Sequence, residues 1–216
     1  MTNDTRFTLP LYTVPLAASF LGMHRTTLNS WVGKPHLLTV LPGQRLEPRI
    51  PFMGLVEAQF YGELRRAGLS MQAIASGMKA VRHDLGDRML ERGVLAHDGK
   101  DILMNLASAG DNPEWERARD RQGGLPEIIE IGLKPIIYVD DDLPGRVRLT
   151  AYGNTSVVAD PRFAFGQPIV EASGSRVEDI LSLFKAGEAV STVAEEMGVS
   201  TDDVESIVRM HLALAA

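Results

Sequence analysis

A short polar stretch between Met23 and Trp31 carries residue types that read nucleic acids. It offers hydrogen-bond donors and acceptors without one carboxylate: His24, Arg25, Thr26, Thr27, Asn29 and Ser30. Arginine can hydrogen-bond guanine in the major groove, asparagine can read adenine, and serine or threonine can contact phosphates or bases. On the exposed face of a helix, this set predicts direct contact with DNA.

The surrounding residues 14–31 have the spacing of a helix-turn-helix. Ala18 supplies the small side chain needed where two helices cross, and Gly22 suits a turn that requires positive φ. Apolar residues then occupy the positions expected to be buried at the turn and on the second helix: Leu21, Met23, Leu28 and Trp31. Such spacing also occurs in ordinary helical cores, and the polar outer face favours the DNA-binding alternative.

A hairpin is expected after the second helix. Leu37–Val40 and Arg49–Ile50 are extended candidates on either side of Pro42-Gly43, which is typical of a turn. As a wing, this hairpin would place three cations near the flanking DNA backbone: Lys34, Arg45 and Arg49. A solvated surface role remains an equal alternative for these three residues.

The helix-turn-helix spacing recurs at residues 190–207. The second copy repeats the small residue, the turn glycine and the buried positions with Ala194, Gly198, Val199, Val204 and Ile207. Its outer face carries Asp202, Asp203 and Glu205, which would repel phosphates. Negative charge does suit a helix N-terminus. This second unit therefore predicts a module for protein contact rather than a DNA reader.

The remaining patterns predict an α+β protein. Helices are expected over Phe52–Ala67 and from a cap at Ser70, and again from Arg176 onward. The middle region predicts strands separated by turns, and a mobile linker or long loop near 108–126. The strand candidates are Val94–Ala96, Ile102–Leu106, Ile128–Ile131, Ile136–Val139 and Val147–Tyr152.

Three regions follow from these patterns. We expect a winged helix-turn-helix domain over 1–90, a β-rich region with a small central sheet over 91–155 and a trihelical, helix-turn-helix-like module over 156–216. The formal charge of −6 is divided unevenly, because residues 1–90 hold ten Lys/Arg against six Asp/Glu, and residues 91–216 hold twelve against twenty-two. The two halves are therefore expected to face different partners.

Other features limit the function. The chain has no cysteine, which excludes disulfides, thiolate metal sites and thiol catalysis. It has no signal-peptide pattern and no run of about 18 apolar residues, which predicts a cytoplasmic protein without a membrane partner. The five histidines lack short metal-ligand spacing. Asp140-Asp141-Asp142 could bind Mg²⁺, but the following Pro144-Gly145 favours a polar hairpin turn, so neither metal, cofactor nor enzymatic activity is predicted.

Two segments resemble known families. Residues 12–82, including TVPLAASFLGMHRTTLNSW and FYGELRRAGLSMQAI, resemble the MerR-like winged helix-turn-helix, without the long coiled-coil helix of typical members. Residues 156–208, with the turn Asp160-Pro161-Arg162, Gly166, Pro168 and Arg176-Val177, resemble the antitoxin-associated domain of unknown function in VapB-type antitoxins. The combination is similar to a subgroup of these antitoxins with mycobacterial members.

The resemblance implies a homodimeric type II antitoxin that neutralises a PIN-like ribonuclease toxin and represses its own operon by binding operator DNA. PIN-type nucleases hold metal ions with clustered carboxylates, which an arginine could block. Arg162 and Arg176 are candidates for that contact, although both also suit ordinary surface roles. The acidic tail, with Asp202 and Asp203, could instead cover a basic RNA-binding surface. Two alternatives stay open, a free-standing regulator whose C-terminal half dimerises or senses a signal, and a metal-dependent enzyme.

Overall fold

The computed structural model describes residues 4–44, 46–92, 94–97, 102–105, 115–118, 120 and 133–215. The N-terminal helices are α1 (Thr5–Thr8), α2 (Val14–Phe20), α3 (Arg25–Val32), α4 (Phe52–Arg66) and α5 (Met71–Leu85), followed by the 3-10 helix η1 (Gly86–Arg88). The strands are β1 (Leu95–His97), β2 (Ile102–Asn105), β3 (Trp115–Arg117), β4 (Ile136–Tyr138), β5 (Pro144–Arg148), β6 (Val157–Ala159) and β7 (Ile169–Val170). Short 3-10 helices η3 (Thr150–Tyr152) and η4 (Ala164–Gly166) lie between them. The C-terminal helices are α6 (Val177–Lys185), α7 (Val190–Met197) and α8 (Thr201–Ala215).

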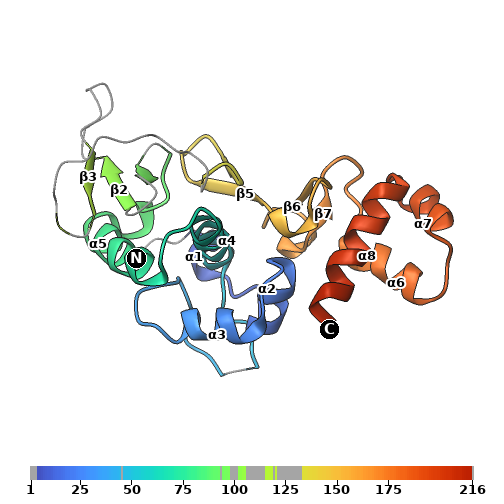
Figure 1. The fold of residues 1–216 in the computed structure, drawn as a ribbon, viewed down its shortest axis with the longest axis horizontal. Coiled ribbons are helices and arrows are strands. Elements are labelled where there is room, and N and C mark those ends of the chain that lie inside the picture. The colour runs from blue at the N-terminus through green and yellow to red at the C-terminus, as the bar shows by residue number, and fades with distance from the viewer. Residues whose placement is uncertain are drawn as a thin grey trace.

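The molecule is elongated (Figure 1). A sheet with the order β1-β2-β3 lies beside α5 at one end, and α6, α7 and α8 form the other end. Between them, α2 and α3 lie below α4, and the second sheet connects this middle part to the C-terminal helices. The expected α+β class, with a helix-turn-helix near the N-terminus and helices at the C-terminus, is confirmed.

Helix α4 is the core of the N-terminal half. Its residues are buried from Phe52 to Leu64 all around the helix. Contacts with α1, α5 and β5 account for this burial. Buried polar residues are tolerated because they find partners: the Gln59 amide donates to Glu63 Oε1 over 2.7 Å and to Thr150 Oγ1 over 2.8 Å.

The expected hairpin over 37–40 and 49–50 is not formed by the described residues. Ile50 instead makes an isolated antiparallel bridge with Tyr12, two residues before the start of α2. Within the loop, the backbone amide of Leu41 donates to the carbonyl of Arg49 over 2.8 Å. The segment is therefore a loop connected to the start of the helix-turn-helix, and the strand prediction for the wing was wrong.

Side chains of α4 and α5 replace strand pairing in this loop. Glu57, 1% exposed, accepts hydrogen bonds from the backbone amide and hydroxyl of Thr39 over 2.5 and 2.6 Å, and pairs with Arg82 over 3.1 Å. The Tyr61 hydroxyl donates to the carbonyl of Leu37 over 2.8 Å. Burial raises the pKa of Glu57, although Arg82 and Thr39 oppose that shift. These contacts explain why a defined loop forms without a hairpin.

The four-stranded antiparallel sheet has the order β4-β5-β6-β7. Its first two strands precede residue 155 and its last two follow it. The sheet thus includes strands from both sides of the boundary expected between the regions 91–155 and 156–216, and that boundary stays a prediction. Asp140–Asp142 form the polar turn between β4 and β5, as expected. Asp141 pairs with Arg6, and Asp142 pairs with Arg92 over 3.1 Å.

Two further predictions need correction. β1 and β2 pair as expected, but β3 lies inside the loop expected near 108–126, where its backbone completes the exposed edge of β2. Apart from residues 118 and 120, the rest of that loop lies outside the described residues, as does the strand expected over Ile128–Ile131. Thr150–Tyr152 form a 3-10 helix instead of continuing β5, because the Thr150 hydroxyl bonds to α4 and Tyr152 is buried.

Among the helices in the described residues, none combines the length and apolarity required to cross a bilayer. The same part of the chain has no group of three or more His, Asp or Glu side chains arranged to hold a metal ion. In the turn between β4 and β5, Asp141 and Asp142 each pair with an arginine.

Candidate DNA-binding surface

The first half of the helix-turn-helix is α2 with its turn. Thr13 caps α2 by accepting a hydrogen bond from the amide of Leu16 over 3.3 Å. Ala18 is buried, and its carbonyl accepts from the amide of Met23 over 2.9 Å, which closes the turn. Gly22 lies within that turn at a φ of 62°. The predicted spacing is confirmed, because the small residue, the turn glycine and the following apolar residue take their expected places.

The second helix, α3, is fixed by its inner face. Leu28 is fully buried and Trp31 is 5% exposed. The Trp31 ring meets Tyr61 of α4 edge to face, with ring centroids 6.2 Å apart. His24 caps α3 through Nδ1, which accepts from the amide of Thr26 over 3.3 Å. Packing on α4 and this cap give α3 a defined orientation toward solvent.

The outer face of α3 presents every polar residue predicted for it. The exposed set is His24, Arg25, Thr26, Thr27, Asn29 and Ser30. Ser30 donates to the carbonyl of Thr27 over 2.7 Å, and His24 pairs with the Thr26 hydroxyl over 2.7 Å. Within the described part of the chain, Arg25 and Asn29 make no side-chain hydrogen bond or ion pair. These two side chains are therefore available for an external partner.

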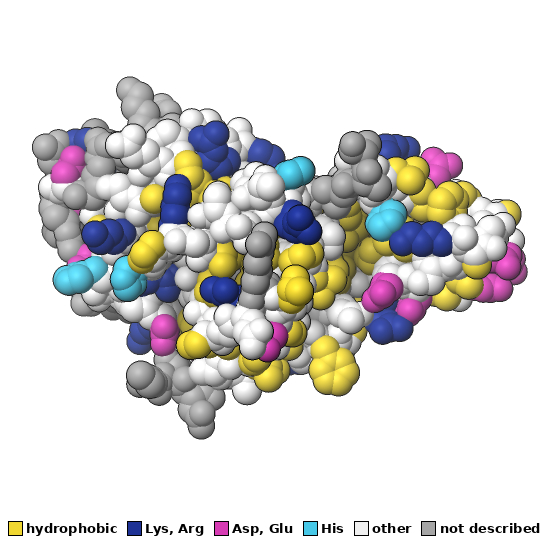
Figure 2. Space-filling view, turned by 90° about the horizontal axis from the view of Figure 1, so that it is seen from below, with side chains coloured by type: hydrophobic (Ala, Val, Ile, Leu, Met, Phe, Trp, Pro, Cys, Tyr) yellow, Lys and Arg dark blue, Asp and Glu magenta, His cyan; other side chains and the backbone are white. Residues whose placement is uncertain are grey.

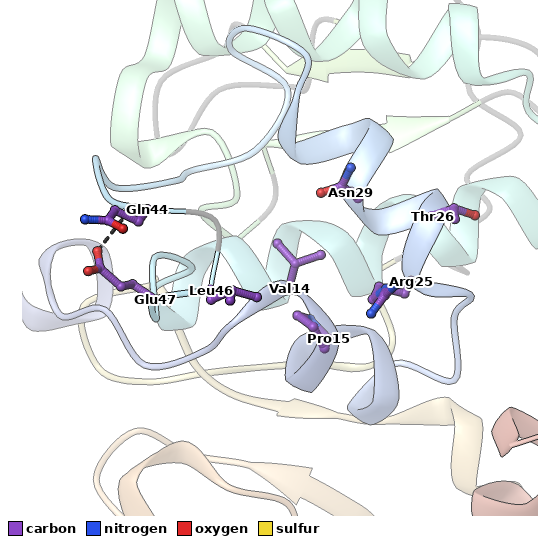
Figure 3. Close-up of a pocket in the computed structure, with 8 residues that line it drawn as sticks. All are labelled: Val14, Pro15, Arg25, Thr26, Asn29, Gln44, Leu46 and Glu47. Carbon is purple, nitrogen blue, oxygen red and sulfur yellow. Dashed lines mark hydrogen bonds between the residues drawn. The ribbon is translucent and has the colours of Figure 1, made fainter.

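A groove of about 450 Å³ separates α3 from the loop after it (Figure 3). On one side lie Arg25 and Asn29 of α3, and on the other lie Gln44, Leu46 and Glu47 of the loop. Leu46 is 82% exposed. The Glu47 carboxylate, the acidic group of the lining, accepts from the amide of Gln44 over 2.9 Å. In this loop the sequence pattern pointed to Arg45 and Arg49, and it gave no signal for Gln44 or Leu46.

The three cations predicted for the wing differ in their surroundings. Lys34 is exposed directly after α3. Arg49 is half-buried beside Tyr12, and its Nε is buried without a hydrogen-bond partner. Arg45 lies outside the described residues. Of the two described cations, Lys34 is the better placed for a phosphate contact.

The C-terminal tail, which consists of α6, α7 and α8, carries its predicted carboxylates at the start of α8. Asp202 and Glu205 are exposed. Asp203 closes a capping box, because its carboxylate accepts from the amide of Ser200 over 3.2 Å and from the Ser200 hydroxyl over 2.7 Å, while its own amide donates to that hydroxyl over 3.1 Å. Burial alone would raise the pKa of Asp203, but hydrogen bonds from Ser200 and Thr155 lower it overall.

The two arginines predicted to contact a partner protein each have a carboxylate nearby. Arg162 is paired with Asp160 over 2.8 Å, and Asp160 is 1% exposed. Arg176 is paired with Asp179 of α6 over 2.6 Å. The two arginine side chains are 59% and 46% exposed. The structure therefore assigns each arginine a local role and leaves part of each side chain accessible.

Family models match both ends of the chain. Residues 10–78 match a model described as "Putative DNA-binding HTH domain", and residues 157–209 match a model described as "Protein of unknown function (DUF433)". The crystal structure of Rv2018 from Mycobacterium tuberculosis is similar, with a TM-score of 0.69 and 29% identity over 94% of this chain and 99% of that one. Fold and surface thus define a DNA-binding protein of the helix-turn-helix class.

Similarity to a named protein identifies the family within the helix-turn-helix class. The M. tuberculosis protein named "Putative antitoxin VapB45" is 33% identical in an alignment that covers 93% of each chain. The chain belongs to this family of VapB-type antitoxins.

Proposed function

We propose that this protein is the antitoxin of a type II toxin–antitoxin pair, acting in the cytoplasm without catalytic activity of its own. In this proposal, α2 and α3 bind operator DNA and repress the operon, and the C-terminal half binds and neutralises a PIN-like ribonuclease toxin. The observation that carries it is the exposed, carboxylate-free face of α3 in a chain related over almost its full length to a VapB-type antitoxin.

The DNA-reading role rests on the chemistry of α3. Arg25 and Asn29 are one helical turn apart, exposed, and at the edge of the same groove. An arginine can bond guanine and an asparagine can bond adenine in the major groove, each through two hydrogen bonds. Lys34 and the loop beyond the groove, including Arg45 and the half-buried Arg49, would lie toward the flanking backbone. A homodimer would then place two such helices on paired half-sites.

For the toxin, we propose a contact surface around the loop 160–166. Phe163 and Phe165 are 59% and 85% exposed, and Arg162 lies with its guanidinium carbon 5.9 Å from the centre of the Phe163 ring. Ala164 and Phe165 adopt φ angles of 46° and 54°, a strained conformation for residues other than glycine. Exposed aromatic and arginine side chains are typical of the energetic centre of a protein interface.

The structure also fixes this loop in place. The Tyr12 hydroxyl donates to the carbonyl of Gly166 over 2.8 Å, which connects the loop to the segment before α2. Burial raises the pKa of Tyr12 well above its usual value, so this hydroxyl keeps its proton as a donor. A rigid loop loses little conformational entropy on binding. Arg176, Asp202 and Asp203 remain secondary candidates for the same partner.

The test is co-purification of the tagged full-length protein from its native host, with wild type, Phe165→Ser and Leu9→Ser compared side by side. Leu9 is a matched control, because it is an exposed apolar residue, 46% exposed, outside the proposed surface. We expect wild type and Leu9→Ser to retain a small ribonuclease in near-equal amount, and Phe165→Ser to lose most of it.

The outcomes separate the parts of the proposal. Recovery of the wild-type protein without any nuclease-like partner would favour a free-standing regulator. Recovery of the nuclease with wild type and Phe165→Ser alike would keep the antitoxin role and reject the loop 160–166 as its contact. Binding of the wild-type protein to DNA from upstream of its own gene tests the repressor role separately.

A further inference from the structure

The charged side chains of α8 are unevenly distributed along the helix. Its carboxylates belong to the first turns, from Asp202 to Glu205, whereas Arg209 follows in its second half. At a rise of 1.5 Å per residue, Arg209 lies about 10 Å along the helix from Asp202 and about 6 Å from Glu205, the last carboxylate of α8. The acidic face that argues against DNA binding by this module therefore does not extend to its C-terminal half.

This C-terminal half of α8 lies against the helix-turn-helix. Ala213 lines a hollow of about 430 Å³ together with His24 and Arg25, the first residues of the DNA-reading face. Ala213 also lines a neighbouring hollow of about 340 Å³ together with Gly22 and two arginines from distant parts of the chain, Arg66 and Arg209. The end of α8 thus separates two hollows that both open beside the turn between α2 and α3.

The cations at this junction are accessible. The Arg209 side chain is 75% exposed, and its ion pair with Glu205 spans 3.9 Å, a geometry that contributes little in water. Arg66 is 52% exposed, although it is bonded to Glu63 and Thr150. Lys185 lines a third hollow, beside α2. Figure 2, seen from the side on which α3 lies, shows basic side chains and histidines on both flanks of the hollow between the main body and the helical tail.

We propose that the C-terminal half of α8 is part of the DNA interface, with Arg209 contacting a backbone phosphate beside the turn at Gly22 and Arg66 supporting it. The proposal rests on the function proposed above, in which α3 enters the major groove. In helix-turn-helix complexes the first helix crosses the sugar-phosphate backbone, so cations beside the turn meet phosphates. The tail would then serve two partners, DNA through one end of α8 and the toxin through another surface.

The experiment measures binding of the full-length protein to labelled duplexes that tile the DNA upstream of its own gene, over a series of salt concentrations. Losing one phosphate contact should reduce the slope of log affinity against log salt by about 0.9. We expect that reduction for Arg209→Ala, with equal weakening on the upstream duplex and on a scrambled one. Arg88→Ala is the matched control, because Arg88 is an exposed arginine, 69% exposed, that pairs with a carboxylate three residues further along the chain, Glu91, and its slope should equal that of wild type.

Arg25→Ala distinguishes the two proposals, because a base contact should weaken the upstream duplex more than the scrambled one. If Arg25→Ala shows that pattern while Arg209→Ala keeps the wild-type slope, the α8 contact is rejected and the role of α3 stands. Tighter binding by Arg209→Ala would also reject the contact, since α8 would then obstruct DNA. If Arg25→Ala binds both duplexes as wild type does, the proposed role of α3 fails.

Discussion

The two helix-turn-helix units of this chain have nearly the same backbone at their turns. Gly22 and Gly198 adopt φ angles of 62° and 64°. In the first unit the amide of Met23 donates to the carbonyl of Ala18 over 2.9 Å, and in the second the amide of Val199 donates to the carbonyl of Ala194 over 3.0 Å. The same spacing of small, turn and apolar residues has therefore produced the same local geometry twice.

Their exposed faces differ. Asn29 in the first unit corresponds to Glu205 in the second, and Thr26 and Thr27 correspond to Asp202 and Asp203. The first unit thus presents neutral and basic hydrogen-bonding groups, and the second presents carboxylates that cap its own helix or face solvent. A shared fold motif does not establish a shared function, because function depends on the side chains that the motif presents.

Their surroundings differ as well. A Cβ atom added to Gly22 would lie 2.6 Å from the Cβ of Ala151, because η3 packs directly on the turn. At Gly198 the nearest atom to an added Cβ is the Ser173 Cβ, 3.9 Å away. Only the first turn is in tight contact with another part of the molecule.

The difference in packing at the two turns predicts the largest effect of a substitution, a loss of stability in Gly22→Ala. Gly22→Ala adds the cost of a left-handed non-glycine residue, about 1–2 kcal/mol, to an overpacking cost of about 1–3 kcal/mol. Gly198→Ala adds only the first cost, about 1–2 kcal/mol. We therefore expect Gly22→Ala to lower the free energy of unfolding by about 2–5 kcal/mol, measured by urea unfolding of both variants and wild type. Equal losses in the two variants would show that Ala151 does not restrict the first turn.

Much of this comparison could be predicted from the sequence. The correspondence of Ala18 with Ala194 and of Gly22 with Gly198 follows from spacing alone, because the constraints are local to one turn. The close approach of Ala151 to Gly22 could not be predicted, since it depends on a 3-10 helix more than a hundred residues away that the sequence pattern assigned to a strand.

The candidate DNA-binding surface also has one part that could be predicted from the sequence and one part that could not. The exposed face of α3 follows from helical periodicity, so its six polar residues were found. The loop opposite α3 could not be derived, because buried side chains such as Glu57 and Arg82 hold it and no backbone pattern records their contacts. Gln44 and Leu46 carry no charge, and only the three-dimensional groove relates them to Arg25 and Asn29.

The difference in DNA binding between the two units can be tested by placing a residue of the second unit at the corresponding position of the first. Asn29→Glu gives the first unit the carboxylate that the second has at Glu205. Losing an asparagine contact to a base costs about 1–3 kcal/mol, and repulsion from phosphates adds to that loss. We expect binding to the upstream duplex to weaken at least tenfold, measured by fluorescence anisotropy at constant salt.

Glu205→Gln is the matched control for that measurement. It removes a carboxylate from the corresponding position of the second unit, and we expect unchanged or slightly tighter binding. Unfolding of both variants should match wild type, because Asn29 and Glu205 are exposed on helices. A strong loss of DNA binding in Glu205→Gln would mean that the second unit reads DNA, and the contrast between the two faces would be wrong.

The smallest expected effect is that of Asp203→Ala in the second unit, which should lower stability without weakening DNA binding. Asp203→Ala removes half of the capping box of α8 and should cost about 1 kcal/mol of unfolding free energy, while binding to the upstream duplex stays unchanged or improves slightly. Because folding lowers the pKa of Asp203 below its ordinary value of 3.8, its carboxylate stabilises the fold above that pH and loses this contribution as the pH falls through the lower, folded value. The difference between wild type and Asp203→Ala in urea unfolding should therefore be constant near neutral pH and shrink below pH 3.8. A difference that persists in strong acid would mean that the protonated Asp203 side chain stabilises the cap as well as its carboxylate does, and the contribution assigned to the charge would be wrong.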